Sequence, residues 1–169
     1  MDSPDAPAKT RQTALRLLSL RDFSEAELGA RLRAKGCTSA AIEGVLEEFR
    51  ERGYVDDVRY AERQAAYLVR EKLYGDRRIE ARLLEKGLAR ETVRQALTSA
   101  RRELPEARAL ALRLEKESRS RDGDTDPKQK RRLFQRLVGR GFPPALVVAA
   151  LQNTLEEHFD DNDGNRDSS

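Results

Sequence analysis

The stretch Arg78–Leu97, RIEARLLEKGLARETVRQAL, decides the fold, because the chain carries two further versions of it. Glu27–Leu46 reads ELGARLRAKGCTSAAIEGVL, and Arg132–Leu151 reads RLFQRLVGRGFPPALVVAAL. Each version contains an Arg-Leu pair, then a basic residue followed by glycine, and ends on leucine. Self-similarity with a period of about 50 residues is typical of tandem repeats of one supersecondary unit. We therefore interpret the chain as a repeat protein.

Each version has the pattern of two helices joined by a glycine turn. Ile79 and Leu83 are four residues apart and so lie on one face of a first helix. Gly87 then ends that helix, because the residue after a helix often needs a positive φ, which glycine adopts without strain. Val93 and Leu97 are again four residues apart, which favours a second helix. The other two versions place Gly36 and Gly141 at the turn.

A further helix precedes each version, and capping residues mark several helix starts. We expect these preceding helices at about Lys9–Arg21, at about Val58–Leu73 and from near Pro105 onward. Ser24 and Glu27 have the spacing of a capping box. Asp126 before Pro127 predicts an N-terminal cap at the corresponding point of the third version.

The segment Gly53–Asp57, GYVDD, joins the first repeat to the second. Gly53 suits a helix C-terminus, and Tyr54 and Val55 can fold back on the helix that it ends. Asp56 or Asp57 can cap the next helix. A structural role is sufficient to explain this segment, and it is favoured over a metal site or a shared proton at the two carboxylates.

These patterns predict an all-α fold of three tandem three-helix repeats. A unit of about 50 residues with few apolar side chains buries too little surface to fold alone. Neighbouring repeats should therefore share a core along an elongated, curved stack. The expected repeats cover residues 9–55, 56–102 and 103–159.

Two terminal tails and one loop are expected to be disordered or mobile. Residues 1–8 are polar and contain proline, and residues 160–169 form an acidic tail of mainly Asp, Asn and Ser with one Gly. Such segments cannot bury enough apolar surface to order themselves, so we expect both termini to be disordered. Ser118–Asp126 is the expected mobile loop of the folded body.

Composition favours a cytoplasmic protein that does not contact a membrane. No apolar run approaches the roughly 20 residues needed to span a bilayer, and no signal-peptide pattern opens the chain. The single cysteine, Cys37, cannot form an internal disulfide, which fits a reducing compartment. We interpret Cys37 as a small side chain beside a turn rather than as a reactive thiol.

The sequence argues against an enzyme. His158 is the one histidine, so neither a His-based metal cluster nor a Ser-His-Asp arrangement is expected. No phosphate-binding loop and no dinucleotide fingerprint is present. We therefore expect no catalytic, metal or cofactor site, and we interpret the molecule as one that acts by binding.

A basic stripe follows the first helix of the second and third versions, and a weaker one follows that of the first version, where Glu27 takes the leading position. Arg78, Arg82 and Lys86 lie at i, i+4 and i+8, hence on one face, about 6 Å apart per step. That step is comparable with phosphate spacing along an extended strand, and arginine forks onto phosphate or carboxylate. A solvated face that makes salt bridges is the other reading, but repetition in register favours an anionic partner. The candidate binding residues are Arg31, Lys35, Arg78, Arg82, Lys86, Lys128, Arg131, Arg132, Arg136 and Arg140.

The total charge conceals an uneven distribution. The net charge is only +3, but residues 127–155 contain no acid, whereas residues 156–169 are predominantly acidic.

The tyrosines Tyr54, Tyr60, Tyr67 and Tyr74 cluster around the second repeat. Their spacings favour packing over the stacking of nucleic-acid bases.

Three segments together resemble the RecX family of regulatory proteins. Gly53–Ala61, GYVDDVRYA, resembles that family's G-Y-[LIV]-[ND]-D-x-x-[FY]-A signature. Tyr74–Gly87 resembles its G-x-x-R-I-x-x-x-L-x-x-K-G segment, and Ser24–Gly36 resembles its S-x-x-E-L-x-x-x-L-x-x-K-G opening. The resemblance covers about residues 10–155 in the right order. The usual proline before Arg78 is replaced by Asp76-Arg77, and the acidic tail is not part of the pattern.

The resemblance implies a modulator, mainly an inhibitor, of the RecA recombinase. RecX proteins are built from three-helix units and bind in the helical groove of the RecA–single-stranded DNA filament. They block filament extension and suppress strand exchange, ATPase and coprotease activity in recombinational repair and the SOS response. The expected partners are therefore the RecA filament and single-stranded DNA, with duplex DNA as a further candidate, for a monomeric protein without cofactors.

Two other classes of function stay open at this stage. A free-standing DNA-binding protein built from helix-turn-helix-like repeats would bind duplex DNA with a steep salt dependence and without recombinase. A helical-repeat adaptor without nucleic-acid contacts would bind its partner independently of salt.

Overall fold

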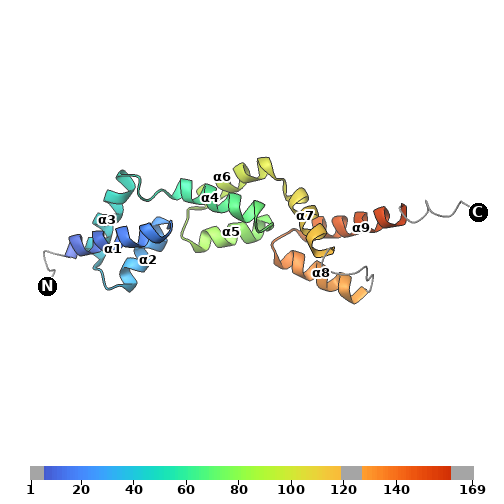
Figure 1. The fold of residues 1–169 in the computed structure, drawn as a ribbon, viewed down its shortest axis with the longest axis horizontal. Coiled ribbons are helices and arrows are strands. Elements are labelled where there is room, and N and C mark those ends of the chain that lie inside the picture. Colours follow the sequence, from blue (N-terminus) through green and yellow to red (C-terminus); the bar gives the residue numbers. More distant parts are fainter. Residues whose placement is uncertain (1–5, 119–126, 161–169) are drawn as a thin grey trace, which may run out of the picture. The chain divides into compact units, whose positions relative to one another are not determined.

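The computed structural model describes residues 6–118 and 127–160, with side chains described for residues 7–117 and 127–152. Within these ranges the chain forms nine helices and no strand, which confirms the predicted all-α fold (Figure 1). The helices are α1 (Ala6–Leu20), α2 (Glu25–Ala34), α3 (Ser39–Glu51), α4 (Asp57–Arg70), α5 (Asp76–Glu85), α6 (Arg90–Glu103), α7 (Glu106–Ser118), α8 (Pro127–Gly139) and α9 (Pro144–Asp160).

The helices follow one another in groups of three, and each repeated version of the sequence forms the last two helices of a group. The turn glycines Gly36, Gly87 and Gly141 have φ of 81°, 77° and 95°, as the helix-ending role predicts. The segment after α3 also behaves as predicted. Gly53 has φ of 68°, and the backbone N–H groups of Tyr54 and Val55 both donate to the Phe49 carbonyl oxygen.

The predicted cap at Ser24 is present, but the capping box is only half formed. Ser24 accepts a hydrogen bond from the Glu27 N–H at 3.2 Å. The Glu27 carboxylate does not return to Ser24 and binds Arg21 and Lys86 instead. The predicted mobile loop Ser118–Asp126 begins with a residue that belongs to α7, and its other residues, 119–126, lie outside the described residues together with the cap predicted at Asp126 and the tail residues 1–5 and 161–169.

Two helix boundaries differ from the prediction. Helix α1 begins at Ala6 rather than near Lys9. Pro7 fits the first turn of a helix, because a backbone N–H group at that position would have no intrahelical acceptor, so its absence in proline costs nothing. Helix α4 ends at Arg70, before the predicted end at Leu73. Leu73 has φ of 49° and is 2% exposed, so its left-handed backbone accompanies a buried side chain.

The described residues divide into two compact units. The first unit comprises residues up to Ala66 together with Glu80–Ser99, and the second comprises Tyr67–Ile79 together with residues from Ala100 onward. The division therefore passes through the middle repeat. The predicted repeat boundaries stay predictions.

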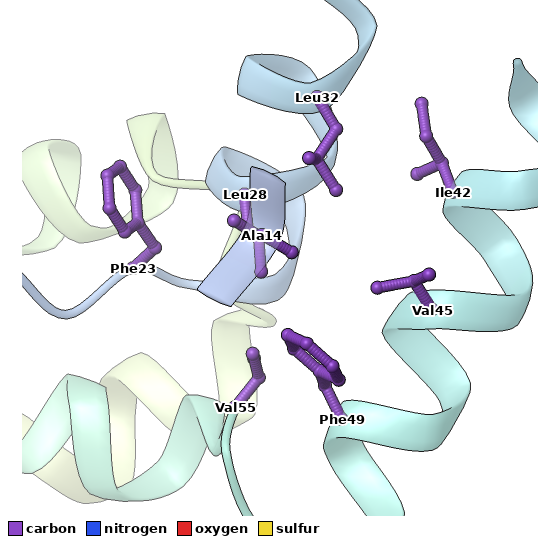
Figure 2. Close-up of a cluster of buried hydrophobic side chains, with 8 residues drawn as sticks. All are labelled: Ala14, Phe23, Leu28, Leu32, Ile42, Val45, Phe49 and Val55. Atoms are coloured by element: carbon purple, nitrogen blue, oxygen red, sulfur yellow. The ribbon is translucent and has the colours of Figure 1, made fainter. Parts of the chain in front are cut away.

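The core of the first unit lies among α1, α2 and α3. Ile42, Val45 and Phe49 share one face of α3 and point toward Leu28 and Ala14 (Figure 2). The complete cluster of buried residues is Ala14, Phe23, Leu28, Leu32, Ile42, Val45, Phe49 and Val55. Burial of each large apolar side chain contributes about 1.5–3 kcal/mol, so this face fixes the position of α2 and its basic residues.

The second unit has a separate core, formed around the helices of the third repeat. Leu137 and Phe142, on either side of the Arg140-Gly141 turn, are fully buried. Its buried members are Leu73, Ala109, Leu110, Leu137, Phe142 and Val147. None of the helices in the described ranges has the length and apolar character to cross a bilayer.

Candidate anion-binding surface

An acidic residue at the start of one repeat caps a helix of the repeat before it. In the first unit, Asp57, the first residue of α4, accepts a hydrogen bond from the N–H of Glu25, the first residue of α2, at 2.8 Å. In the second unit, Glu106, the first residue of α7, accepts one from the N–H of Asp76, the first residue of α5, at 2.8 Å. Asp56 caps its own helix by accepting from the Arg59 N–H, as predicted.

The Lys86-Gly87 and Arg140-Gly141 turns contact residues that directly precede these two helices, α2 and α5. Ser24 donates its hydroxyl hydrogen bond to the Lys86 carbonyl oxygen, and the Gly75 N–H donates to the Arg140 carbonyl oxygen at 3.0 Å. A Cβ at Gly87 would overlap the Cβ of Ala26, whereas a Cβ at Gly36 would meet nothing within 4 Å. The glycine of the second repeat therefore serves close packing as well as backbone conformation. Gly141 is similarly enclosed, since its Cβ would overlap Arg78 and Gly75.

Lys86 belongs to an ionic network in the first unit. Its ammonium lies 2.7 Å from Glu27 Oε1, and Arg21 binds the same carboxylate at 2.8 Å. The Tyr60 hydroxyl reaches Glu27 Oε2 at 3.5 Å. Burial alone would raise the pKa of Glu27, but the hydrogen bonds from Arg21 and Lys86 and their charges lower it to about 2. Lys86 is thus held by an ion pair within the first unit.

The second unit places two arginines over one aromatic ring. The Arg78 guanidinium lies 4.7 Å from the centroid of the Tyr74 ring, and that of Arg140 lies 5.8 Å from it. Arg78 also donates to the Gly139 carbonyl oxygen at 2.7 Å. Burial lowers the pKa of Arg140, and the charges of Arg113 and Arg78 lower it further. The Tyr74 ring offsets part of this repulsion, because its π face attracts cations.

Arg136 and Arg113 bind the same carboxylate in the second unit. Glu117 Oε1 lies 2.6 Å from Arg113 Nη2, and Glu117 Oε2 lies 3.4 Å from Arg136 Nη2. Burial would raise the pKa of Glu117, but the hydrogen bond from Arg113 and the charges of Arg113, Arg136 and Arg140 lower it. We call Arg78, Arg113, Arg136 and Arg140 the arginine cluster.

The structure separates the ten predicted binding residues into two groups. Four are half-buried and make the contacts described above: Arg78, Lys86, Arg136 and Arg140. The other six are exposed, and we call them the exposed basic set: Arg31 and Lys35 at α2, Arg82 on α5, and Lys128, Arg131 and Arg132 on α8. The first group makes contacts within the fold, and the second group is exposed to solvent.

Sequence reasoning missed several residues that shape this surface. Arg113 and Glu117 lie on α7, outside the repeated versions, so the repeat pattern gave no signal for them. Glu27 did carry a signal. It stands at the register of Arg78 in the second version, and an acid at a position where another repeat has a base can indicate an internal ion pair.

Comparisons with known proteins agree with this architecture. Residues 11–49 match the family description "RecX, first three-helix domain", and residues 56–97 match "RecX, second three-helix domain". The chain is 46% identical over 79 residues to the regulatory protein RecX of Vibrio cholerae and 38% identical over 93 residues to that of Ectopseudomonas mendocina. These alignments cover 47% and 55% of this chain but only 51% and 61% of the relatives.

A relative from Thermus thermophilus, also a regulatory protein RecX, matches over a longer stretch. It is 36% identical over 144 residues, which cover 85% of this chain and 91% of the relative. Two solved structures share the fold. The crystal structure of RecX from Lactobacillus salivarius has a TM-score of 0.75 at 20% identity, covering 89% of this chain and 97% of that one. The crystal structure of a regulatory protein RecX has a TM-score of 0.71 at 23% identity, covering 88% and 72%.

Proposed function

This chain belongs to the RecX family of regulatory proteins, and we propose that it regulates the RecA recombinase, mainly by inhibiting it. The family membership follows from the Thermus thermophilus relative, which the chain matches over nearly all of its length. The proposed partner follows from the family. A protein with this partner would act in the cytoplasm.

The proposed mechanism is binding along the groove of the RecA–single-stranded DNA filament. Several linked three-helix repeats would contact successive recombinase subunits. Several modest contacts on one molecule then act together, because linked contacts raise the effective concentration of each other's partners. Bound in this way, the protein would block filament extension and suppress strand exchange, ATPase and coprotease activity in recombinational repair and the SOS response.

The exposed basic set is the observation that supports this proposal. It places accessible cationic side chains on or beside the second helix of every repeat: α2, α5 and α8. Its four arginines, Arg31, Arg82, Arg131 and Arg132, offer planar guanidinium groups that can bind phosphate or carboxylate with two hydrogen bonds each. Such groups suit either the DNA backbone or an acidic protein surface in the filament.

The test must use exposed residues. Arg136 is bound to Glu117 and Lys86 to Glu27, so replacing either would also weaken the fold. We therefore choose the triple variant Arg82→Ala, Arg131→Ala, Arg132→Ala. Its matched control is Arg90→Ala, Arg102→Ala, Arg108→Ala, which removes the same charge from exposed positions on α6 and α7.

The measurement is the ATPase rate of RecA on single-stranded DNA, together with strand exchange, at increasing concentrations of each protein. We expect the first variant to need about tenfold more protein for half-inhibition, and the control to behave like the parent chain. Unchanged inhibition by the first variant would contradict the proposed role of this set. Absence of inhibition by the parent chain, combined with salt-dependent DNA binding, would instead favour the free-standing DNA-binding protein.

A further inference from the structure

The arginine cluster of the second unit carries more positive charge than the described acidic residues bonded to it neutralise. The four guanidinium groups of the arginine cluster lie around the Tyr74 ring and the Glu117 carboxylate. Tyr74 contacts Arg78 and Arg140, while Glu117 contacts Arg113 and Arg136. Glu117 is the one acid bonded to any of these guanidinium groups within the described ranges. Four positive charges thus face one negative charge.

Within the arginine cluster, Arg140 has the fewest hydrogen-bonding or anionic partners among the described residues. Its guanidinium makes no hydrogen bond or ion pair to any described residue and only lies over the Tyr74 ring. It is half-buried, and burial together with the charges of Arg113 and Arg78 lowers its pKa. A desolvated cation beside other cations is costly unless an anion is bound near it.

We propose that the arginine cluster binds a phosphate group and that Glu117 occupies part of this site until the phosphate displaces it. A phosphate offers oxygen atoms in more directions than a carboxylate does, so it can satisfy more than one planar guanidinium at once, and a phosphate monoester or free phosphate also carries more charge. A single carboxylate, like that of Glu117, leaves the other arginines unbalanced. The phosphate can belong to a nucleic-acid strand or to a small free anion.

This proposal rests on the proposed function only for the source of the phosphate. The site lies entirely within the second unit, and its test uses the full chain without recombinase. A failure of this test therefore leaves inhibition of RecA as a separate question, and a failure of inhibition leaves phosphate binding to be measured by itself.

The experiment follows the arginine Nε–Hε resonances of the full chain by NMR during titration with methyl phosphate. Acetate at the same ionic strength is the parallel titration. We expect saturable shifts of the arginine side-chain signals with methyl phosphate and at most a weak, non-saturating response to acetate. Equal responses to both anions would overturn the proposal, because the site would then sense ionic strength alone.

Variants distinguish a built site from a general positive field. Arg140→Gln should weaken methyl phosphate binding by about tenfold, because it removes a charge-assisted donor pair. Arg108→Gln removes the same charge from an exposed position on α7 and should leave binding within about twofold. Equal effects of the two variants would overturn the proposal. If circular dichroism shows that Arg140→Gln does not fold, Arg140→Lys keeps the charge and should still weaken binding several-fold by losing the fork.

A substitution at Glu117 tests whether phosphate displaces the Glu117 carboxylate from the arginine cluster. Glu117→Gln removes the competing negative charge, so methyl phosphate should bind about threefold or more tightly. Unchanged or weaker binding would show that Glu117 is a structural support and would overturn its proposed role as an occupant.

A final titration with a short thymidine oligonucleotide identifies the source of the phosphate. Competition with methyl phosphate, lost in Arg140→Gln, would assign the site to a nucleic-acid strand. Binding of methyl phosphate without such competition would assign it to a small free anion. Binding of neither would overturn the proposal.

Discussion

Gly87 lies against Ala26 so closely that a side chain on the glycine would overlap the alanine methyl group. The two residues belong to neighbouring repeats, and both lie in the first unit. Gly36 has nearly the same φ in the first repeat but no neighbour within 4 Å of a Cβ built on it. One glycine of the repeated sequence is therefore required by backbone conformation alone, and the other by conformation and packing together.

Substitutions at Gly36 and Gly87 can separate the requirement of backbone conformation from that of close packing. Gly36→Ala should lower the free energy of unfolding by about 1 kcal/mol, the cost of a left-handed alanine. Gly87→Ala should lower it by about 1–3 kcal/mol more, because the Ala26 backbone must move to relieve the overlap. Urea denaturation followed by circular dichroism measures both values. Equal losses in the two variants would contradict the close packing at Gly87.

Glu27 should make stability depend on pH. Its pKa is lowered from 4.5 to about 2 in the folded chain, so its carboxylate stabilises the fold above about pH 4.5. This contribution should disappear progressively as the pH falls from 4.5 toward 2. Glu27→Gln should therefore lower the free energy of unfolding by about 2 kcal/mol at pH 7 and by much less near pH 2.

The pH effect of Glu27 is measured as a difference between chains, since every other carboxyl group titrates in both. Urea denaturation of the parent chain and of Glu27→Gln, each at pH 7 and near pH 2, gives this difference. Glu43→Gln is the matched control, because Glu43 is exposed on α3 and has no ion-pair partner among the described residues. A loss of stability in Glu27→Gln that stays constant with pH would contradict the ionic explanation.

Glu106 should tolerate replacement by glutamine but not by alanine. Burial raises its pKa, and the charge of Asp76 does so further, while the hydrogen bond from the Asp76 N–H partly opposes them. Glu106→Gln keeps an oxygen acceptor for that N–H and removes a disfavoured charge, so its stability at pH 7 should equal or exceed that of the parent chain. Glu106→Ala should lose about 1 kcal/mol, as other helix caps do. Thermal unfolding of both variants provides the comparison, and equal losses would exclude the capping role.

Charge reversal should separate the two groups of basic residues on α8. Arg136→Glu places a second carboxylate beside Glu117 and should lower the free energy of unfolding by about 1–2 kcal/mol at low salt. Arg132→Glu changes an exposed side chain and should stay within about 0.5 kcal/mol. Denaturation at low and high salt tests the assignment, since added salt should reduce the difference. Similar stability of the two variants would argue against a supporting role for Arg136.

Periodic features of the sequence were predictable, and individual long-range contacts were not. The helix–glycine–helix pattern follows from spacing and from the special backbone of glycine, so Gly36, Gly87 and Gly141 were placed correctly. The cap at Ser24 was local and was also found. Glu27 was assigned to that cap because its real partner, Lys86, is distant in sequence.

The basic stripe shows the same limit. Its spacing placed all members on one helix face, but spacing does not determine whether an arginine faces solvent or a neighbouring repeat. Arg136 and Arg140 turn toward Glu117 and Tyr74, which lie outside the stripe. Leu73 is a third case, because its burial in the second unit accompanies a backbone conformation that no local pattern indicated.

The carboxylates of Asp57 and Glu106 give the joint between consecutive repeats a direction. Each stands first in the leading helix of its repeat and accepts from the first N–H of a helix in the repeat before it. A designer who inserted a further repeat between two of these would therefore begin its leading helix with an acid.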